Sequence, residues 1–236
     1  MKNQFVCLAN VTIILLLMFG CGSEEKPSNK LIKYNLGVEI QENVFNEEVL
    51  SKVGNLENFL DLLTANGMRV SNGAQPPTIM ADILKGDFGV RYTVESLCIY
   101  DGKNSSNVGE VFGGFFMEML IDTEPGLNNL GRLRYSSLSS DNYPEYPNGI
   151  DSGEGSGYAS GGADNFTLFV LVENARFRNI PYKALWIISG SYNYYLLTNF
   201  TMCFVILEKG NDPNDELANP GTIRIFSDPQ PDMYWD

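Results

Sequence analysis

Apolar and polar residues alternate along most of the chain after residue 90, at the two-residue spacing that is typical of β-strands. Clusters of Gly, Asn, Asp and Pro separate the alternating runs and predict turns. In 166–173 both faces of the run are largely apolar, so we expect this strand to be covered on both sides. The predicted strands are 90–100, 110–122, 132–138, 166–173, 183–189, 200–208 and 222–226. Strands joined by short connections predict a mainly β fold, either an antiparallel barrel or, as the alternative, a β-sandwich.

A helical spacing precedes the strands. Asn46 is a suitable N-cap, and Asn66-Gly67 is a typical helix end. Gly54 lies within the run and permits two shorter helices in place of one. Before this run, the alternation of residues 36–40 predicts a short strand. The apolar positions with helical spacing are Val49, Leu50, Val53, Leu56, Leu60 and Leu63, and we interpret them as a packing face.

The first twenty residues have the pattern of a secretory leader. A positively charged start, 1–4, precedes a largely apolar run to Gly20, which is shorter than the ~20 apolar residues of a membrane-spanning helix. The run ends at Gly20-Cys21-Gly22-Ser23, which resembles the lipobox of bacterial lipoproteins. The resemblance implies cleavage before Cys21 and attachment of acyl chains such as palmitate to its thiol. Met18 and Phe19 depart from the Leu and small residue usual there, and an uncleaved signal anchor is the alternative.

The polar residues after Cys21 predict a flexible tether. Its acidic pair, Glu24-Glu25, resembles the surface-export signal of Bacteroidetes lipoproteins. Pro76-Pro77-Thr78-Ile79 and the closing 221–226 resemble uncharacterised Bacteroidetes lipoproteins with a lipocalin-like barrel. These resemblances imply a lipid-anchored protein of the cell outer membrane, facing the surface or the periplasm. We therefore expect a signal peptide (1–20), a tether (21–30), an N-terminal segment with a helix (31–70) and an antiparallel β domain (71–236).

Composition excludes several classes of function. The chain has no histidine, which removes the commonest general base, imidazole metal ligands and the usual activation of Ser or Cys nucleophiles. The net charge of −13 repels phosphate backbones, so nucleic acid is not an expected partner. No cofactor is expected.

Two cysteines remain in the β domain. Cys98 and Cys203 each lie in a predicted strand among apolar neighbours. Outside the cytoplasm an even pair is compatible with a disulfide, and apolar surroundings suit two buried free thiols equally well.

Two further segments are candidates for ligand contact. The Gly-rich stretch 139–165 reads as a long loop that faces a ligand or is flexible, and its carboxylates offer a weaker case for Ca²⁺. A hairpin turn is predicted within 190–193. The aromatic residues around it could stack on a sugar at a barrel mouth, with ordinary cross-strand packing as the alternative. These aromatics are Trp186, Tyr192, Tyr194 and Tyr195.

Three hypotheses on function follow. The first is a non-catalytic module that binds a small molecule, a glycan or a lipid. The second is a structural or assembly component that contacts another envelope protein. The third is a glycoside hydrolase driven by two carboxylates, with Glu118, Asp122 and Glu173 as candidates that no motif distinguishes.

Overall fold

The computed structural model describes residues 33–80, 89–137, 150–194, 196–228 and 231–233. Cys21, Tyr195 and the leader lie outside these ranges. The helices in this part are η1 (Ile40–Val44), α1 (Glu47–Val53), α2 (Leu56–Ala65) and η3 (Ser105–Asn107). The strands are β1 (Ala74–Gln75), β2 (Val90–Asp101), β3 (Val111–Asp122), β4 (Leu130–Ser137), β5 (Asp151–Gly162), β6 (Asn165–Phe177), β7 (Ile180–Asn193), β8 (Leu196–Lys209), β9 (Ile223–Asp228) and β10 (Asp232–Met233).

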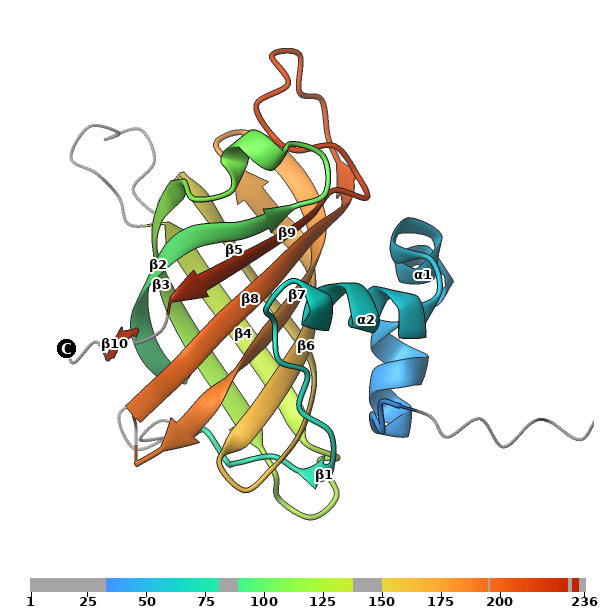
Figure 1. The fold of residues 1–236 in the computed structure, drawn as a ribbon, viewed down its shortest axis with the longest axis vertical. Helices are drawn as coiled ribbons and strands as arrows, with labels where there is room; N and C mark the ends of the chain where they lie inside the picture. The colour runs from blue at the N-terminus through green and yellow to red at the C-terminus, as the bar shows by residue number, and fades with distance from the viewer. Residues whose placement is uncertain (1–32, 81–88, 138–149, 195, 229–230, 234–236) are drawn as a thin grey trace, which may run out of the picture. The chain divides into compact units, whose positions relative to one another are not determined.

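The long strands close into a ring. Each strand from β2 to β9 pairs antiparallel with the next one along the chain, and β9 returns to pair with β2. In the described part of the chain, eight strands therefore form an up-and-down barrel (Figure 1). The expected antiparallel barrel is confirmed. We call the end with the β2–β3, β6–β7 and β8–β9 connections the upper end, and the opposite one the lower end.

Side chains fill the inside of the barrel. On β6, Phe166, Leu168, Val170 and Val172 point inward, as the alternation predicts, and all are buried. Tyr92, Met117, Met119, Tyr135 and Phe200 are among the largest fully buried side chains of the same cluster. Among the described residues, these inward side chains pack against one another and form the inner core of the barrel.

The N-terminal helices cover one side of the barrel (Figure 1). Asn46 caps α1 by accepting a hydrogen bond from the backbone N–H of Val49 at 3.0 Å. Gly54, with φ of +79°, separates α1 from α2, so the predicted break is confirmed. Phe45 packs edge-on against Phe169 of β6, with ring centroids 5.6 Å apart. This second core explains why both faces of β6 are apolar, and residues 33–236 form one compact unit.

Three local predictions are wrong. The strand predicted at 36–40 is absent, because residues 38–39 are helical and Ile40 begins η1. The turn between β7 and β8 comes after Asn193 and not within 190–193, and Tyr194 there has φ of +47°. Within the predicted loop 139–165, residues 151–162 form β5 and 165 begins β6, while 138–149 lie outside the described ranges.

Candidate functional site

The three predicted aromatics that the structure describes, Trp186, Tyr192 and Tyr194, do not come together. Trp186 and Tyr192 both lie on the inner face of β7, but six residues separate them, which is roughly 20 Å along a strand. Tyr194 is 93% exposed at the lower end. Trp186 packs between Tyr135 and Phe204, with ring centroids 4.8 Å away in both cases. The cross-strand packing alternative therefore describes Trp186.

The two cysteines are not bridged. Cys98 and Cys203 are both free and buried. Cys98 belongs to the core inside the barrel, whereas Cys203 belongs to the core under the helices, so the barrel wall lies between them. Burial raises the pKa of both thiols. A protonated, enclosed thiol is a poor nucleophile, which makes both residues structural.

An open groove lies on the outer wall near η1. It comprises two separate hollows of about 320 and 410 Å³, one around Ile40 at the start of η1 and one around Val44 at its end. Leu130 and Tyr158 line the second hollow, and the residues next to them in the chain, Asn129 and Ala159, line the first. We call this concavity the outer groove. Its lining carries Glu39, Glu124, Glu154 and Glu173 as carboxylates and Asn43, Asn128, Asn129 and Asn174 as amides.

A β-bulge aims two of these side chains outward. Between Val172 and Ala175, β6 has one residue more than either neighbouring strand needs for continuous pairing. Val172 and Ala175 both face the inner core, so Glu173 and Asn174 are consecutive residues that are both exposed. Bulges commonly reorient a side chain next to a binding site. Here the bulge delivers a carboxylate and an amide to the same groove.

The glycines of β5 let the wall of the groove approach β6 closely. A Cβ on Gly155 would lie 2.1 Å from the Leu171 carbonyl oxygen, and one on Gly157 would lie 1.9 Å from that of Phe169. The predicted loop is thus a strand that only glycine can form at these positions. A signal was present in the sequence, because Gly153, Gly155 and Gly157 alternate with larger residues at a period of two.

A row of alternating charges crosses the outer face beside the groove. The Arg91 Nε donates to the Glu118 carboxylate at 2.7 Å, and the Arg134 Nη1 donates to its other oxygen at 3.3 Å. The Arg134 Nε donates to Glu154 at 3.1 Å. These residues are direct register partners on β2, β3, β4 and β5. Glu118 is therefore held between two guanidinium groups and supports the wall.

The three carboxylates of the hydrolase hypothesis do not form a pair at the groove. Asp122, at the end of β3, accepts the backbone N–H of Glu124 at 3.0 Å and shapes a turn. Among Glu118, Asp122 and Glu173, only Glu173 lines the outer groove. A hydrolytic site built from these residues is not supported by their positions.

A buried polar cluster lies inside the barrel behind the groove. The Tyr182 hydroxyl donates to the Asp151 carboxylate at 2.5 Å, and the Tyr135 hydroxyl lies 2.6 Å from that of Tyr182. Burial raises the pKa of Asp151 to about 7. Burial also raises the pKa of both tyrosines well above the ordinary value. Sequence reasoning missed this cluster, because nothing local marks an aspartate and two tyrosines from three strands as neighbours.

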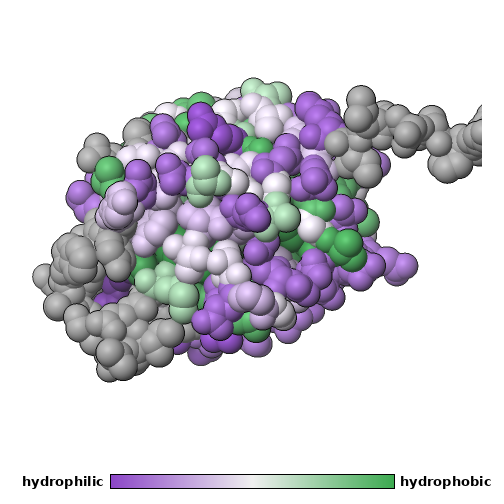
Figure 2. All heavy atoms as spheres, turned by 90° about the horizontal axis from the view of Figure 1, so that it is seen from below, coloured by the Kyte–Doolittle hydropathy of each residue, from purple (hydrophilic) through white to green (hydrophobic). Residues whose placement is uncertain are grey.

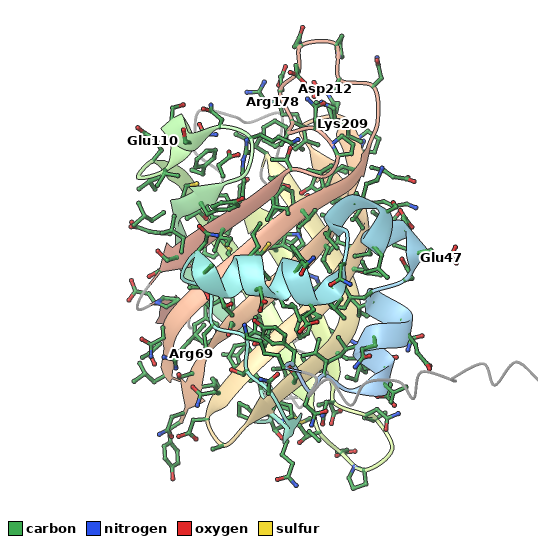
Figure 3. The ribbon with its side chains drawn as sticks, turned by 45° about the vertical axis from the view of Figure 1, so that its right-hand side comes forward. Glu47, Arg69, Glu110, Arg178, Lys209 and Asp212 are labelled. Atoms are coloured by element: carbon green, nitrogen blue, oxygen red, sulfur yellow. The ribbon has the colours of Figure 1, made fainter. Side chains whose placement is uncertain are left out.

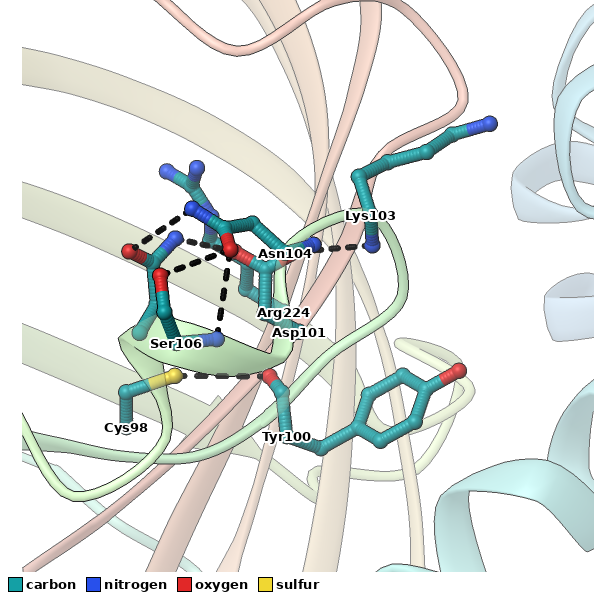
Figure 4. Close-up of polar contacts among 8 residues, drawn as sticks. Cys98, Tyr100, Asp101, Lys103, Asn104, Ser106 and Arg224 are labelled. Carbon is teal, nitrogen blue, oxygen red and sulfur yellow. Dashed lines mark hydrogen bonds and ion pairs between the residues drawn. The ribbon is translucent and has the colours of Figure 1, made fainter.

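A second buried carboxylate organises the upper end (Figure 4). Burial alone would raise the pKa of Asp101, but hydrogen bonds lower it to about 2. Asn107 and Arg224 donate side-chain hydrogen bonds at 2.7 Å, and the backbone N–H groups of Lys103 and Asn104 donate at 2.8 and 3.0 Å. Every oxygen is satisfied, so Asp101 is a structural anchor for the β2–β3 connection.

The β8–β9 connection is held over the same end. Lys209 donates to Asp212 and Asp215, each at 3.0 Å, and to the Leu217 carbonyl oxygen at 2.9 Å (Figure 3). Leu217 is buried in the inner core. This connection therefore closes the barrel with an apolar side chain.

Figure 2 views the lower end of the molecule, where hydrophilic side chains dominate and the apolar patches between them are small. Within the described ranges, no group of three or more acidic or cysteine side chains is placed to hold a metal ion. None of the helices in those ranges is long and apolar enough to cross a membrane.

Comparison with known proteins adds no assignment: no protein-family model, no curated protein and no solved structure matches the chain.

Proposed function

We propose that this chain is a lipid-anchored envelope protein that binds a glycan in the outer groove without chemical change. The observation that carries the proposal is the β6 bulge, which directs Glu173 and Asn174 into a groove large enough for several sugar units. The anchor is the acyl-modified Cys21 that the lipobox-like leader implies.

The chemistry of the groove favours a sugar over an acyl chain. Carboxylate and amide groups pair well with hydroxyl groups, which both donate and accept hydrogen bonds. A lipid tail would remove water from these groups and leave them unpaired, at a cost of several kcal/mol. Tyr158, which lines the groove and is partly exposed, offers a ring face on which a sugar can pack.

The packed interior also favours the outer wall. A ligand inside the barrel would have to displace fully buried side chains such as Tyr92 and Phe200. Each displaced aromatic side chain costs about 3 kcal/mol or more in lost packing.

Binding can be tested with the full-length chain in detergent micelles. The probes are cello-, malto-, xylo- and chito-oligosaccharides, with a fatty acid as the lipid arm, and the readouts are thermal shift and calorimetry. We expect saturable binding of one oligosaccharide class and no binding of the fatty acid. Saturable fatty-acid binding with no oligosaccharide response would overturn the proposal.

Variants locate the site. Glu173→Gln and Asn174→Ala each remove one polar contact and should weaken oligosaccharide binding about tenfold or more. Glu110→Gln is the matched control, since Glu110 is exposed at the upper end away from the groove (Figure 3). Equal affinity in all three variants would place the ligand elsewhere. A single stoichiometric protein recovered from crosslinked membranes, with no oligosaccharide bound, would favour the assembly hypothesis instead.

The anchor has its own test. Intact-protein mass spectrometry of the membrane fraction should find a chain that starts at Cys21 and carries acyl groups. A chain that retains Met1 and an unmodified Cys21 thiol would contradict the location.

A further inference from the structure

The hydrogen bond between Asp151 and Tyr182 crosses the inner face of a strand. Asp151 begins β5, Tyr182 lies on β7, and β6 runs between them. Ala175 of β6 is the register partner of Tyr182 and is fully buried, and its single methyl group leaves room for the bond. Tyr135 of β4 extends the contact. Three side chains thereby tie together four neighbouring strands, β4 to β7.

Of the strands that this cluster spans, β4, β5 and β6 line the groove, and β6 carries its bulge. Glu173 and Asn174 leave the barrel wall immediately before Ala175, so the bulge and the Asp151–Tyr182 bond occupy opposite faces of one short stretch of β6. The inner side of this stretch is closely packed. A Cβ on Gly153 would lie 2.8 Å from the Tyr135 hydroxyl and 2.9 Å from a methyl carbon of Val172.

No described cation neutralises Asp151. Tyr182 and Tyr135 are the titratable groups that face its carboxyl group. Arg178, whose backbone N–H bonds to the neighbouring Ile150 carbonyl, directs its guanidinium group to a glutamate of the β8–β9 connection. Arg176 is exposed, and Lys209, the register partner of Tyr182, binds two aspartates of that same connection.

We propose that proton binding at Asp151 regulates the outer groove, by holding β5 and β7 together across β6 and so supporting the bulge that carries Glu173 and Asn174. This regulation rests on the proposed glycan-binding function of the same groove. Above neutral pH the carboxylic acid releases its proton to water, and the partly buried carboxylate left behind has no charged partner among the described residues. A conformer in which the start of β5 turns its carboxylate to solvent then gains population.

The direction of the effect follows. The protonated form keeps the four strands in register and the groove intact. Deprotonation loosens the stretch of β6 around the bulge, so ligand affinity falls as the pH rises. We expect a loss of about tenfold in affinity between about pH 6 and pH 8, because the carboxyl group changes protonation state within this interval.

The experiment uses a signal inside the protein and needs no ligand. Trp186 lies 4.8 Å from the Tyr135 ring, so its fluorescence reports on the cluster. Trp235, the other tryptophan, is replaced by Phe in every sample. Full-length protein is titrated in micelles, and hydrogen exchange of the 171–175 amides is followed in parallel. We expect the Trp186 fluorescence and the protection factors of these amides to change together, with a midpoint near pH 7.

Two variants identify the group that titrates. Asp151→Asn keeps the shape and cannot ionise, so both transitions should disappear. Tyr182→Phe leaves the carboxyl group but cuts its link to β7, so the 171–175 amides should exchange rapidly at every pH. The inference would be overturned if neither the fluorescence nor the protection factors of the parent protein changed with pH. It would also be overturned if the transitions persisted in Asp151→Asn.

The two proposals can fail separately. If the transitions occur and vanish in Asp151→Asn while no oligosaccharide binds, the regulation of the bulge stands and the glycan proposal fails. If an oligosaccharide binds with an affinity that does not change from about pH 6 to pH 8, the glycan proposal stands and the regulation is refuted.

Discussion

Tyr182 donates a hydrogen bond to Asp151 over a distance of 2.5 Å, although a whole strand separates the two residues in the sheet. The bond satisfies one carboxylate oxygen but supplies no positive charge. Burial consequently dominates and keeps the pKa of Asp151 near 7.

The first prediction concerns stability against pH. In the unfolded chain Asp151 titrates near its ordinary pKa of about 4, and in the folded chain near 7. Between these values the folded state binds more protons, so the free energy of unfolding falls as the pH rises through this window. We expect Asp151→Asn to be about 4 kcal/mol more stable than the parent at pH 8, and close to it at pH 4. Urea unfolding at both pH values measures this. An equal difference at both would contradict it.

The second prediction concerns the row of charges on the outer wall. The Glu118 side chain is 10% exposed and that of Glu154 is 64% exposed, while Arg134 binds both. Screening by water weakens exposed pairs, so double-mutant cycles should give about 1 kcal/mol for Arg134 with Glu118 and a few tenths for Arg134 with Glu154. Added salt should reduce the smaller value further. Equal coupling energies would refute the role of burial.

The third prediction concerns β5. Gly157→Ala would place a methyl group 1.9 Å from the Phe169 carbonyl oxygen, so the strand must shift. We expect a loss of about 3 kcal/mol or more, or failure to fold. Gly162→Ala on the same strand is the control, since its nearest atom, the Asn72 carbonyl oxygen, is 4.0 Å away. Chemical unfolding of the two variants provides the comparison, and similar stabilities would argue against the pairing of β5 with β6.

The fourth prediction concerns the cap of the upper end. Leu217→Ala removes a buried side chain from the inner core and should lower the free energy of unfolding by about 2 to 3 kcal/mol. Leu127, which is 40% exposed on the β3–β4 connection, is the matched control, and Leu127→Ala should cost less than about 0.5 kcal/mol. Thermal unfolding of both variants is the measurement. A cap that contributes nothing would make the two melting temperatures equal.

The fifth prediction concerns the thiols. Cys98 and Cys203 are free and buried, and burial raises the pKa of both thiols. Neither should therefore react with iodoacetamide in the folded protein. Both should react once the protein is unfolded in urea without a reductant. Peptide mapping by mass spectrometry locates the label. A Cys98–Cys203 crosslinked peptide would contradict the separation of the two residues by the barrel wall.

The sequence was informative wherever side chains repeat with a period. Local pattern alone predicts the strands around Val170 and Val205, the N-cap of α1 at Asn46 and the end of α2 at Asn66. β5 was missed although its glycines recur with a period of two, because glycine carries no hydropathy signal and the strand depends on close approach to the Phe169 and Leu171 carbonyl groups. Such contacts form only in the folded sheet.

The candidate site was harder to predict for the same reason. Glu173 was singled out as a carboxylate, but its exposure beside Asn174 depends on a register shift against β5 and β7. Asp151 looked like a loop residue. Its contact with Tyr182 joins strands that are not neighbours, and no spacing along the chain encodes it. The aromatic residues failed as a site because hydropathy does not distinguish a packed ring such as Trp186 from one that faces a ligand.

The closure of the sheet between β5 and β6 has a consequence for how another polypeptide can meet the barrel. Each of the eight strands of the ring pairs with a neighbour on both sides, although β2 and β8 pair with β9 over only part of their lengths. Within the described ranges, the closed ring therefore leaves a foreign polypeptide little open edge on which to add itself as a further strand. A molecule that recognises the barrel therefore has to do so through contacts with its side chains.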